Sequence, residues 1–176
     1  MNQGELTKEL RENAVLNLYQ NQGYQTERVE RKTLLLVIEA SNHASFTINL
    51  QEPLRIDKLS DMYLDSFVTV NCTTGVSPAL ENSGFILKLD QFNINTVAGS
   101  TDTTTGAKLF NSIFIPNEHT TANQTVSHKC KKINYICSVN PSKIFTISGS
   151  LMALDGSDPF AGSGHAIAEF TFISRN

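Results

Sequence analysis

The segment KIFTISGSLMALD, residues 143–155, determines the fold class that the sequence predicts. Its apolar residues Phe145, Ile147, Leu151 and Ala153 alternate with threonine and serine. A period of two residues is typical of a β-strand that buries one face, because successive side chains point to opposite sides. The turn sequence NPS precedes the segment and DG follows it. A strand of this length needs partners of similar length, so a β-sheet protein is expected.

Seven further strands are predicted on either side of this segment, separated by loops rich in polar residues, glycine and proline. Their approximate ranges are 34–38, 45–51, 61–72, 85–94, 109–115, 133–139 and 167–174. After residue 32 strands and helices do not alternate, which excludes a parallel α/β sheet. The sequence therefore predicts an all-β fold with eight antiparallel strands.

Several of these strands carry expectations about their faces and ends. The run 34–38 is continuously apolar, which predicts a strand that is covered on both faces. The strand 45–51 should end at Pro53. In the strand 85–94, a phase slip near Gln91 would suit a bulge. The strand 61–72 should bury the face formed by Met62, Leu64, Val68 and Val70. The strand 167–174 should bury the face formed by Ala168, Phe170 and Phe172.

Eight antiparallel strands within about 130–145 residues fit a jelly-roll β-sandwich, in which two Greek keys form two four-stranded sheets. An eight-stranded up-and-down barrel is the main alternative. Long loops are predicted at 73–83, 95–106 and 117–132. They favour the jelly roll, because connections across the ends of a sandwich are longer than hairpins.

The first 32 residues differ from the rest of the chain. Apolar residues recur there every four positions between charged side chains: Leu6, Leu10, Ala14 and Leu18. This is the pattern of an amphipathic helix about 22 Å long. We expect a helical arm over 1–32 and a single jelly-roll domain over 33–176. The apolar stripe is interpreted as partner-binding, on a neighbouring subunit; the alternative is that it packs on its own domain.

Composition and charge exclude several classes of protein. The chain has 176 residues, of which 40% are hydrophobic and 18% charged, and its net charge is −3. This predicts a globular protein without direct attraction to nucleic acid or anionic membranes. The arm contains five acidic and five basic residues, so it is not a basic nucleic-acid-binding tail. Neither a signal peptide nor an apolar run of ~20 residues is visible, so a soluble protein without membrane insertion is expected.

The cysteines and histidines do not form a recognisable site. Three cysteines without a CxxC pair argue against a disulfide framework or a zinc site. Cys72 and Cys137 lie in predicted strands and are expected to be buried thiols, whereas Cys130 lies in a predicted loop. The histidines are scattered without the spacing of metal ligands: His43, His119, His128 and His165. We therefore predict no catalytic, metal-binding or cofactor-binding residue, no cofactor, and no enzymatic activity.

A basic cluster, Lys129, Lys131 and Lys132, falls within the predicted loop 117–132. One interpretation is a weak partner-binding site for phosphate or for an acidic protein surface. The alternative is the solvated rim of a loop. Aromatic residues do not alternate with these lysines, as a single-strand nucleic-acid binder would require.

Five strings follow one another along the chain. They are IDKLSDMYLDSF (56–67), FILKLDQF (85–92), IFIPNE (113–118), KINY with a later NP (132–135 and 140–141), and AEFTFISR (168–175). In their order and spacing they resemble single jelly-roll capsid proteins of large icosahedral double-stranded DNA viruses, of the nucleocytoplasmic large DNA virus type. The resemblance covers roughly residues 56–175 and rests on strand and turn patterns.

The resemblance implies a structural capsid protein. The most specific role that the resemblance implies is the penton, of which five copies close each icosahedral five-fold vertex. The alternative is another minor capsid protein. It implies a homopentamer that contacts neighbouring major and minor capsid proteins. It also implies a place in the virion, at the capsid vertex, after assembly in the host cytoplasm.

Three further classes are weighed against this one. A glycan-binding jelly-roll attachment module would stack sugars on exposed aromatic rings, but tryptophan is absent, and the candidate rings are Tyr24, Tyr63 and Tyr135. A cupin-like enzyme is disfavoured by the scattered histidines. A small RNA-virus coat protein is disfavoured by the neutral arm, because genome packaging there uses a basic one.

Overall fold

The computed structural model describes residues 29–72, 83–97, 99–100, 109–117 and 125–175, and for 128–133 and 161–162 it describes the backbone alone. The predicted arm, up to residue 28, lies outside the described residues, as does nearly all of the predicted loop 73–83. A compact unit runs from Glu30 to Arg175.

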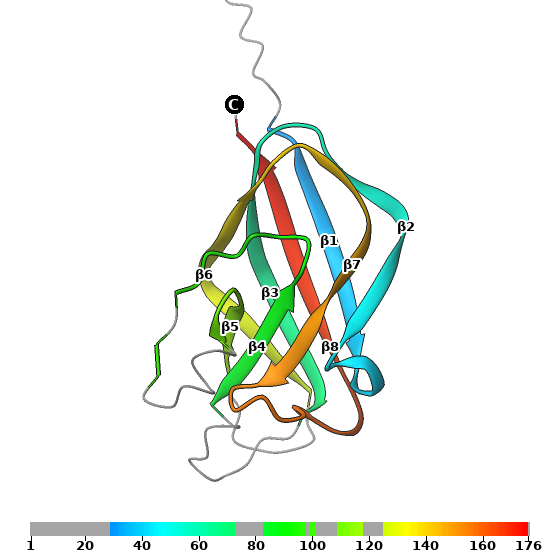
Figure 1. The fold of residues 1–176 in the computed structure, drawn as a ribbon, viewed down its shortest axis with the longest axis vertical. Coiled ribbons are helices and arrows are strands. Elements are labelled where there is room, and N and C mark those ends of the chain that lie inside the picture. The colour runs from blue at the N-terminus through cyan, green and yellow to red at the C-terminus, as the bar shows by residue number, and fades with distance from the viewer. Residues whose placement is uncertain (1–28, 73–82, 98, 101–108, 118–124, 176) are drawn as a thin grey trace, which may run out of the picture. The chain divides into compact units, whose positions relative to one another are not determined.

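Eight strands in this part of the chain form two four-stranded antiparallel sheets, which confirms the all-β prediction (Figure 1). The first sheet has the order β1-β8-β3-β6, and the second has the order β2-β7-β4-β5. The strands are β1 (Arg31–Glu39), β2 (Phe46–Ile56), β3 (Ser60–Cys72), β4 (Gly84–Leu89), β5 (Ile113–Pro116), β6 (Val126–Val139), β7 (Ser142–Ala153) and β8 (Phe160–Ser174). A short 3-10 helix, η1 (Ala40–Asn42), follows β1.

A hydrophobic core lies between the two sheets and draws buried side chains from both. Aromatic contacts link them: the rings of Phe67 on β3 and Phe85 on β4 lie 5.5 Å apart between centroids. Phe92, after β4, and Phe172 on β8 lie 5.8 Å apart. The inward positions of β8 are Ala168, Phe170 and Phe172, as predicted. Burial of these large rings accounts for much of the hydrophobic stabilisation of the sandwich.

The strand that decides the fold class, β7, follows its predicted pattern over most of its length. Ile147, Leu151 and Ala153 are buried, as predicted. Phe145 is 58% exposed, so its predicted burial is wrong. The cause is the register with β2, which shifts between Asn49 and Leu54, so that four residues of β2 stand opposite Phe145. Such a bulge changes which face a side chain occupies.

The prediction that β1 is covered on both faces is wrong for the described residues. Leu34, Leu36 and Ile38 are buried in the core. Leu35 is 60% exposed and Val37 is 48% exposed on the opposite face. The strand lies at the edge of the first sheet, next to β8, and the described chain places no second layer on its outer face.

The predicted buried face of β3 is correct in its first half and wrong in its second. Its fully buried apolar side chains are Met62, Leu64 and Phe67. The register with both neighbouring strands shifts between Leu64 and Ser66. This shift moves the alternation by one residue, so Val68 and Val70 lie on the outer face instead of the core face.

Several predicted strand boundaries also change. β2 continues through Pro53, which an edge strand tolerates because its free side needs no N–H donor. β4 ends at Leu89, and Phe92 reaches the core from the segment that follows. β6 begins at Val126, so the predicted loop 117–132 is wrong from that residue onward. Pairing with β3 draws this polar segment into the sheet.

Candidate interaction surface

The outer face of the first sheet carries an exposed apolar patch. Val37 of β1, Ile167 of β8 and Val68 of β3 lie directly opposite one another across three strands. Leu35 lies two positions away on β1 and is the most exposed of the four. We call Leu35, Val37, Val68 and Ile167 the outer apolar patch; Val68 and Ile167 are half-buried. Apolar side chains gathered on one exposed face are typical of a contact surface.

The outer face of the second sheet is polar by comparison, although Phe114 on β5 and Phe145 on β7 are also exposed. β7 presents Thr146, Ser148 and Ser150 on this face. Ser148 donates a hydrogen bond from Oγ to the carboxylate of Asp90 at 2.8 Å. Thr146 Oγ1 donates to the side-chain amide oxygen of Asn49 on β2 at 3.1 Å. The polar side chains of this face bond to one another, so the two sheets differ in what they offer to a partner.

Hydrogen-bonded polar side chains border the outer apolar patch. Arg31 Nη2 lies 3.3 Å from Asp65 Oδ2 and donates to Thr171 Oγ1 at the same distance. The Thr171 hydroxyl in turn donates to Asp65. Ser66 Oγ donates to Glu169 Oε2 at 3.0 Å. An apolar centre with a satisfied polar border is the usual anatomy of a protein–protein interface.

A second polar cluster lies on the same face, where β8 ends. The Arg175 guanidinium makes bidentate contacts with Asp61, from Nε to Oδ2 at 2.9 Å and from Nη2 to Oδ1 at 2.5 Å. Arg175 also donates to Ser138 Oγ at 2.7 Å, and the Tyr135 hydroxyl lies 2.9 Å from the same oxygen. The rings of Tyr63 and Tyr135 pack edge to face at 5.9 Å.

The charge of Asp61 is stabilised by this cluster. The hydrogen bonds from Arg175 hold the pKa of the Asp61 carboxyl below its ordinary value, against the opposing effect of desolvation. The hydroxyl of Ser138 adds to the lowering. The pair ties the end of β8 to the start of β3, and Arg175 N also donates to the Leu59 carbonyl at 2.8 Å. The cluster therefore anchors the border of the surface.

The candidate residues from the sequence fall in different places. Leu6, Leu10, Ala14 and Leu18 lie outside the described residues, and their role stays a prediction. Lys129, Lys131 and Lys132 lie on β6 rather than in a loop, because β6 pairs with β3 from Val126 onward. The side chains of the three lysines lie outside the described part of the structure.

The two cysteines that the structure describes fully are buried, as predicted. Both Cys72 and Cys137 are free thiols. Burial raises the pKa of Cys72 to about 12 and that of Cys137 to about 11. A thiol with so high a pKa is a poor nucleophile at neutral pH.

Within the described ranges, no group of three or more histidine, cysteine, aspartate or glutamate side chains could hold a metal ion. His43 Nε2 lies 3.5 Å from Asp158 Oδ1, and its Nδ1 lies 2.7 Å from the Ala40 carbonyl oxygen. His165 lies opposite Glu39 on the neighbouring strand. In the same part of the chain, no helix is long and apolar enough to cross a membrane.

Sequence analysis missed the outer apolar patch, although one signal pointed to it. The continuous apolar run in β1 predicted cover on both faces, and the described chain supplies cover on one. A partner that covers the second face would explain why that face of β1 is apolar. The sequence did not indicate that Val68 is exposed, because the period-two alternation of the strand assigned it to the core face.

Comparison with protein-family models gives no match, and comparison with curated protein sequences gives none either. Among solved structures, similar chains come from a structure of the T13 IBDV viral particle, at 8% identity and a TM-score of 0.28. A second is from the infectious bursal disease virus Gx strain, at 12% identity and a TM-score of 0.28. A third is from the VP2 subviral particle of infectious bursal disease virus, at 9% identity and a TM-score of 0.24.

Each of these three similarities covers 82% of this chain and 31 to 33% of the other chain. This chain therefore spans about a third of the length of those proteins. TM-scores of this size do not establish a shared fold.

Proposed function

We propose that this protein is a structural subunit of a viral capsid, without catalytic activity or a cofactor, and that it contacts other subunits through the outer apolar patch. The observation that carries the proposal is the exposure of Leu35 and Val37 on a strand whose other face buries Leu34, Leu36 and Ile38 in the core. A partner that covers them removes apolar surface from water, which is the main driving force of association. A stable contact would bury about 1,200 Å² or more in total.

The pairing of the strands supports a jelly roll, the sandwich expected of such a capsid protein. Strand β1 pairs with β8, β2 with β7, β3 with β6 and β4 with β5. This nested pairing is what results when one long hairpin of four strand pairs is rolled into a sandwich. An up-and-down barrel would pair consecutive strands throughout. In the described chain, β4 and β5 are the one consecutive pair.

The more specific role that we propose is the penton, a homopentamer at the five-fold vertices of a large DNA virus. It is supported by the resemblance of the strings 56–67 and 168–175 to capsid proteins of that type. Asp61 comes from the first string and Arg175 from the last, and the two form the ion pair that anchors the face. The proposed partners are further copies and neighbouring major and minor capsid proteins, in a virion that assembles in the host cytoplasm.

The N-terminal arm is assigned to the same assembly. Its predicted apolar stripe would bind a neighbouring subunit. Deleting residues 1–25 should leave a folded β domain, because Glu30–Arg175 forms a compact unit. Far-ultraviolet circular dichroism measures the folding, and co-assembly with the other shell proteins measures incorporation. Normal incorporation of the truncated protein would refute the role of the arm.

The first test is the absolute mass of the purified protein by light scattering over a concentration series. One chain has a mass of 19.4 kDa, so a pentamer has a mass of about 97 kDa. The double variant Leu35→Asp/Val37→Asp should shift the mass toward one chain, because charge on the patch opposes its burial. Thr47→Asp adds one negative charge on the polar face of the second sheet; it is the control for added charge and should keep the wild-type mass.

Each result of this test has a consequence. A trimer would contradict the penton and favour another capsid subunit. A wild-type protein that stays monomeric would contradict self-association. A double variant that keeps the wild-type mass would show that the outer apolar patch is not the contact.

A second candidate function is glycan binding, which the exposed ring of Tyr135 favours. Tyr135 is 53% exposed and lies beside Ser138 and Arg175, which offer polar groups next to an aromatic face. Sugars bind by such a combination of stacking and hydrogen bonds. A glycan array tests it, with Tyr135→Ala as the negative control. Signal at background level for the wild type would remove this candidate.

A further inference from the structure

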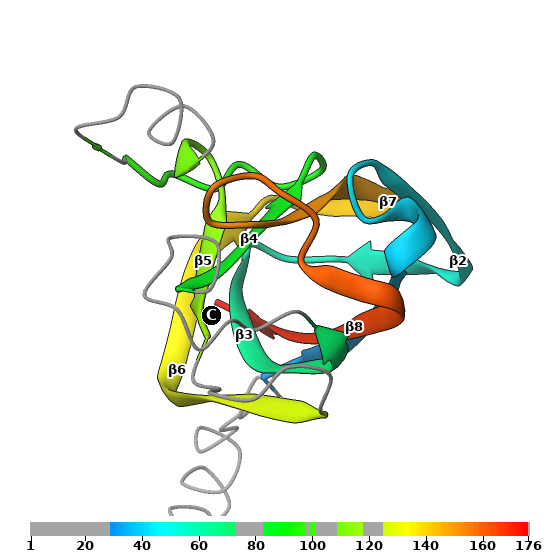
Figure 2. The ribbon, with the colours of Figure 1, turned by 90° about the horizontal axis from the view of Figure 1, so that it is seen from below.

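One edge strand lacks the features that normally keep the edge of a sheet from pairing with another chain. The edge strands of the described sheets are β1, β2, β5 and β6 (Figures 1 and 2). β2 contains Pro53 and shifts its register with β7, β5 is four residues long and ends at Pro116, and β6 shifts its register with β3. Proline, bulges and short length protect an exposed edge. β1 contains no proline, and its nine residues pair with β8 without a shift.

The backbone of β1 directs alternate residues toward β8 and toward the free edge of the sheet. The Ser174 N–H donates to the Glu30 carbonyl oxygen at 3.0 Å, and the Glu30 N–H donates to Ser174 Oγ at 2.9 Å, so Glu30 faces β8. Because this direction alternates along a strand, the odd-numbered residues of β1 direct their N–H and C=O groups away from β8. In the described sheets, no strand pairs with that side of β1. The odd-numbered residues are Arg31, Thr33, Leu35, Val37 and Glu39.

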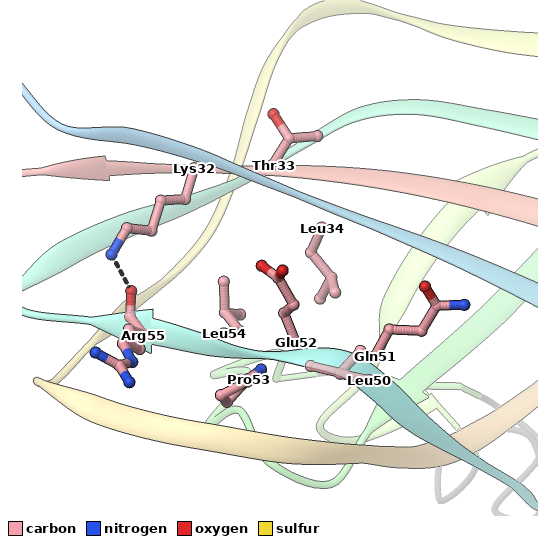
Figure 3. A pocket seen from close by; sticks show the side chains of 9 residues that line it. All are labelled: Lys32, Thr33, Leu34, Leu50, Gln51, Glu52, Pro53, Leu54 and Arg55. Carbon is pink, nitrogen blue, oxygen red and sulfur yellow. Dashed lines mark hydrogen bonds between the residues drawn. The ribbon is translucent and has the colours of Figure 1, made fainter.

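The side chains of the odd-numbered residues are all exposed, whereas the even-numbered side chains are used within the molecule. Figure 3 shows Lys32 and Leu34 directed from β1 toward β2, and Thr33 directed away from it. Lys32 Nζ donates to the Arg55 carbonyl oxygen and so links β1 to β2. The surface that β1 offers to another molecule is therefore its free edge together with the exposed row of odd-numbered side chains.

The exposed row of β1 is complementary in charge to a reversed copy of itself. Arg31 is at its first position and Glu39 at its last, with uncharged residues between them. The side chain of Arg31 is 66% exposed and uses one nitrogen, Nη2, for its contact with Asp65. The guanidinium has further N–H donors for a second carboxylate. Glu39 is exposed and lies opposite His165 on β8. An antiparallel second β1 would therefore place opposite charges together at both ends.

We propose that β1 pairs with β1 of a second copy of this chain, antiparallel, about a two-fold axis that passes through Leu35. In this register Arg31 lies opposite Glu39, Thr33 opposite Val37, and Leu35 opposite its own symmetry mate. Every residue of the strand is then paired, and the residues that direct their backbone groups to the free edge face one another as hydrogen-bonded pairs. A shift of the register in either direction would leave strand ends unpaired and separate Arg31 from Glu39.

The contact is isologous, because the same surface is used on both copies. It joins the first sheets of two molecules into one continuous sheet, and the two outer apolar patches become one larger apolar surface across the axis. Leu35 packs beside its symmetry mate and Val37 beside Thr33, so part of their exposed surface is removed from water. The inference goes beyond the proposed function, because a two-fold contact joins two copies whether or not five copies close a vertex.

Variants with one added cysteine test the register, with a short bismaleimide as cross-linker. Leu35→Cys should give a covalent dimer of about 39 kDa on a denaturing gel, twice the 19.4 kDa of one chain. Thr33→Cys and Val37→Cys should each give little dimer alone, since each lies about 14 Å along the strands from its own symmetry mate. A mixture of the two should give the dimer. The wild type, with its three cysteines, supplies the background.

Charge exchange tests the same contact by light scattering over a concentration series. Glu39→Arg places like charges together at both ends of the contact and should weaken association about tenfold. Arg31→Glu should do the same, but it also removes the contact with Asp65, so thermal melting checks that it is folded. The combined variant Arg31→Glu/Glu39→Arg restores opposite charges and should recover the wild-type mass. Asp90→Arg makes the same change of charge at an exposed residue after β4, and this matched control should keep the wild-type mass.

The results separate this contact from the proposed function. A pentamer whose Leu35→Cys variant does not cross-link would overturn the β1 contact and leave the proposed function standing. A cross-linked dimer that Glu39→Arg dissociates would support the contact, and a mass that never exceeds two chains would at the same time contradict the pentamer. A combined variant that is folded but stays dissociated would overturn the pairing of Arg31 with Glu39, and the register with it. A wild type at 19.4 kDa at every concentration would overturn the contact.

Discussion

Alanine substitutions at Ile147 and Phe145 compare two side chains that the sequence assigns to the same buried face of β7. Ile147 has no exposed surface, whereas Phe145 is 58% exposed. Removing the Ile147 side chain leaves a cavity in the core and should cost about 2–5 kcal/mol of unfolding free energy. The Phe145 ring lies 4.8 Å from Lys143 Nζ. An exposed cation–π contact of this kind contributes about 0.5–1 kcal/mol, which is the loss expected for Phe145→Ala.

Thermal melting followed by circular dichroism separates these two losses. For a domain of this size, 1 kcal/mol shifts the melting temperature by about 2–4 °C, so Ile147→Ala should melt roughly 4–20 °C below the wild type. Phe145→Ala should melt within about 4 °C of it by the same conversion. Equal losses in both variants would refute the reasoning, since they would place Phe145 in the core and remove the bulge in β2 as the cause of its exposure.

Three further predictions concern charge, reactivity and packing. Because the pKa of Asp61 is lowered from its ordinary 3.8, its ionised form stabilises the fold above that pH, and the stabilisation is lost as the pH falls through the folded value. In urea titrations from neutral to acid pH, Asp61→Asn should flatten this dependence, and an unchanged slope would contradict it. Cys72 and Cys137 should react with a thiol reagent at pH 8 in denaturant and not in the folded protein; fast reaction when folded would contradict their burial. Gly149→Ala should cost about 1–3 kcal/mol or more, because its Cβ would lie 1.9 Å from a backbone oxygen of β4. Gly99→Ala has open space and should cost little; equal losses would contradict the packing.

The existence of the strands could be predicted from the sequence, because alternation with a period of two is a local property. The inward residues of β8, Ala168, Phe170 and Phe172, follow from that pattern alone. The burial of Cys72 and Cys137 follows from their place in apolar strands. These features depend on neighbours along the chain and on little else.

The faces of long strands could not be predicted beyond a bulge. In β3 one shift of register reverses the alternation after Leu64, and in β2 another exposes Phe145 on the neighbouring strand. A bulge is set by how two distant strands align, and the sequence of one strand does not contain that information. The segment after residue 117 was misassigned for a related reason, because polar residues on β6 pair with β3 although their composition favours a loop.

The candidate surface was partly encoded in the sequence. The apolar run of β1 required cover on two faces, but a sequence does not say whether the cover comes from the same chain or from another molecule. In the described part of the structure Leu35 and Val37 are exposed, and this could not be read from the apolar run alone. The three lysines were visible in the sequence, while the place of their backbone on β6, an edge strand of the first sheet, depends on the strand order.

The pairing of β1 with β8 has a consequence for synthesis of the protein on the ribosome. The two strands are the first and the last of the described domain, and more than a hundred residues separate their partners Leu34 and Phe170. Pairing of such distant segments slows folding, since the loop between them must first be ordered. Until β8 emerges from the exit tunnel, β1 has no strand beside it and is apolar on both faces. In this state the run 34–38 is exposed apolar surface, and we expect it to be the segment that chaperones bind on the nascent chain.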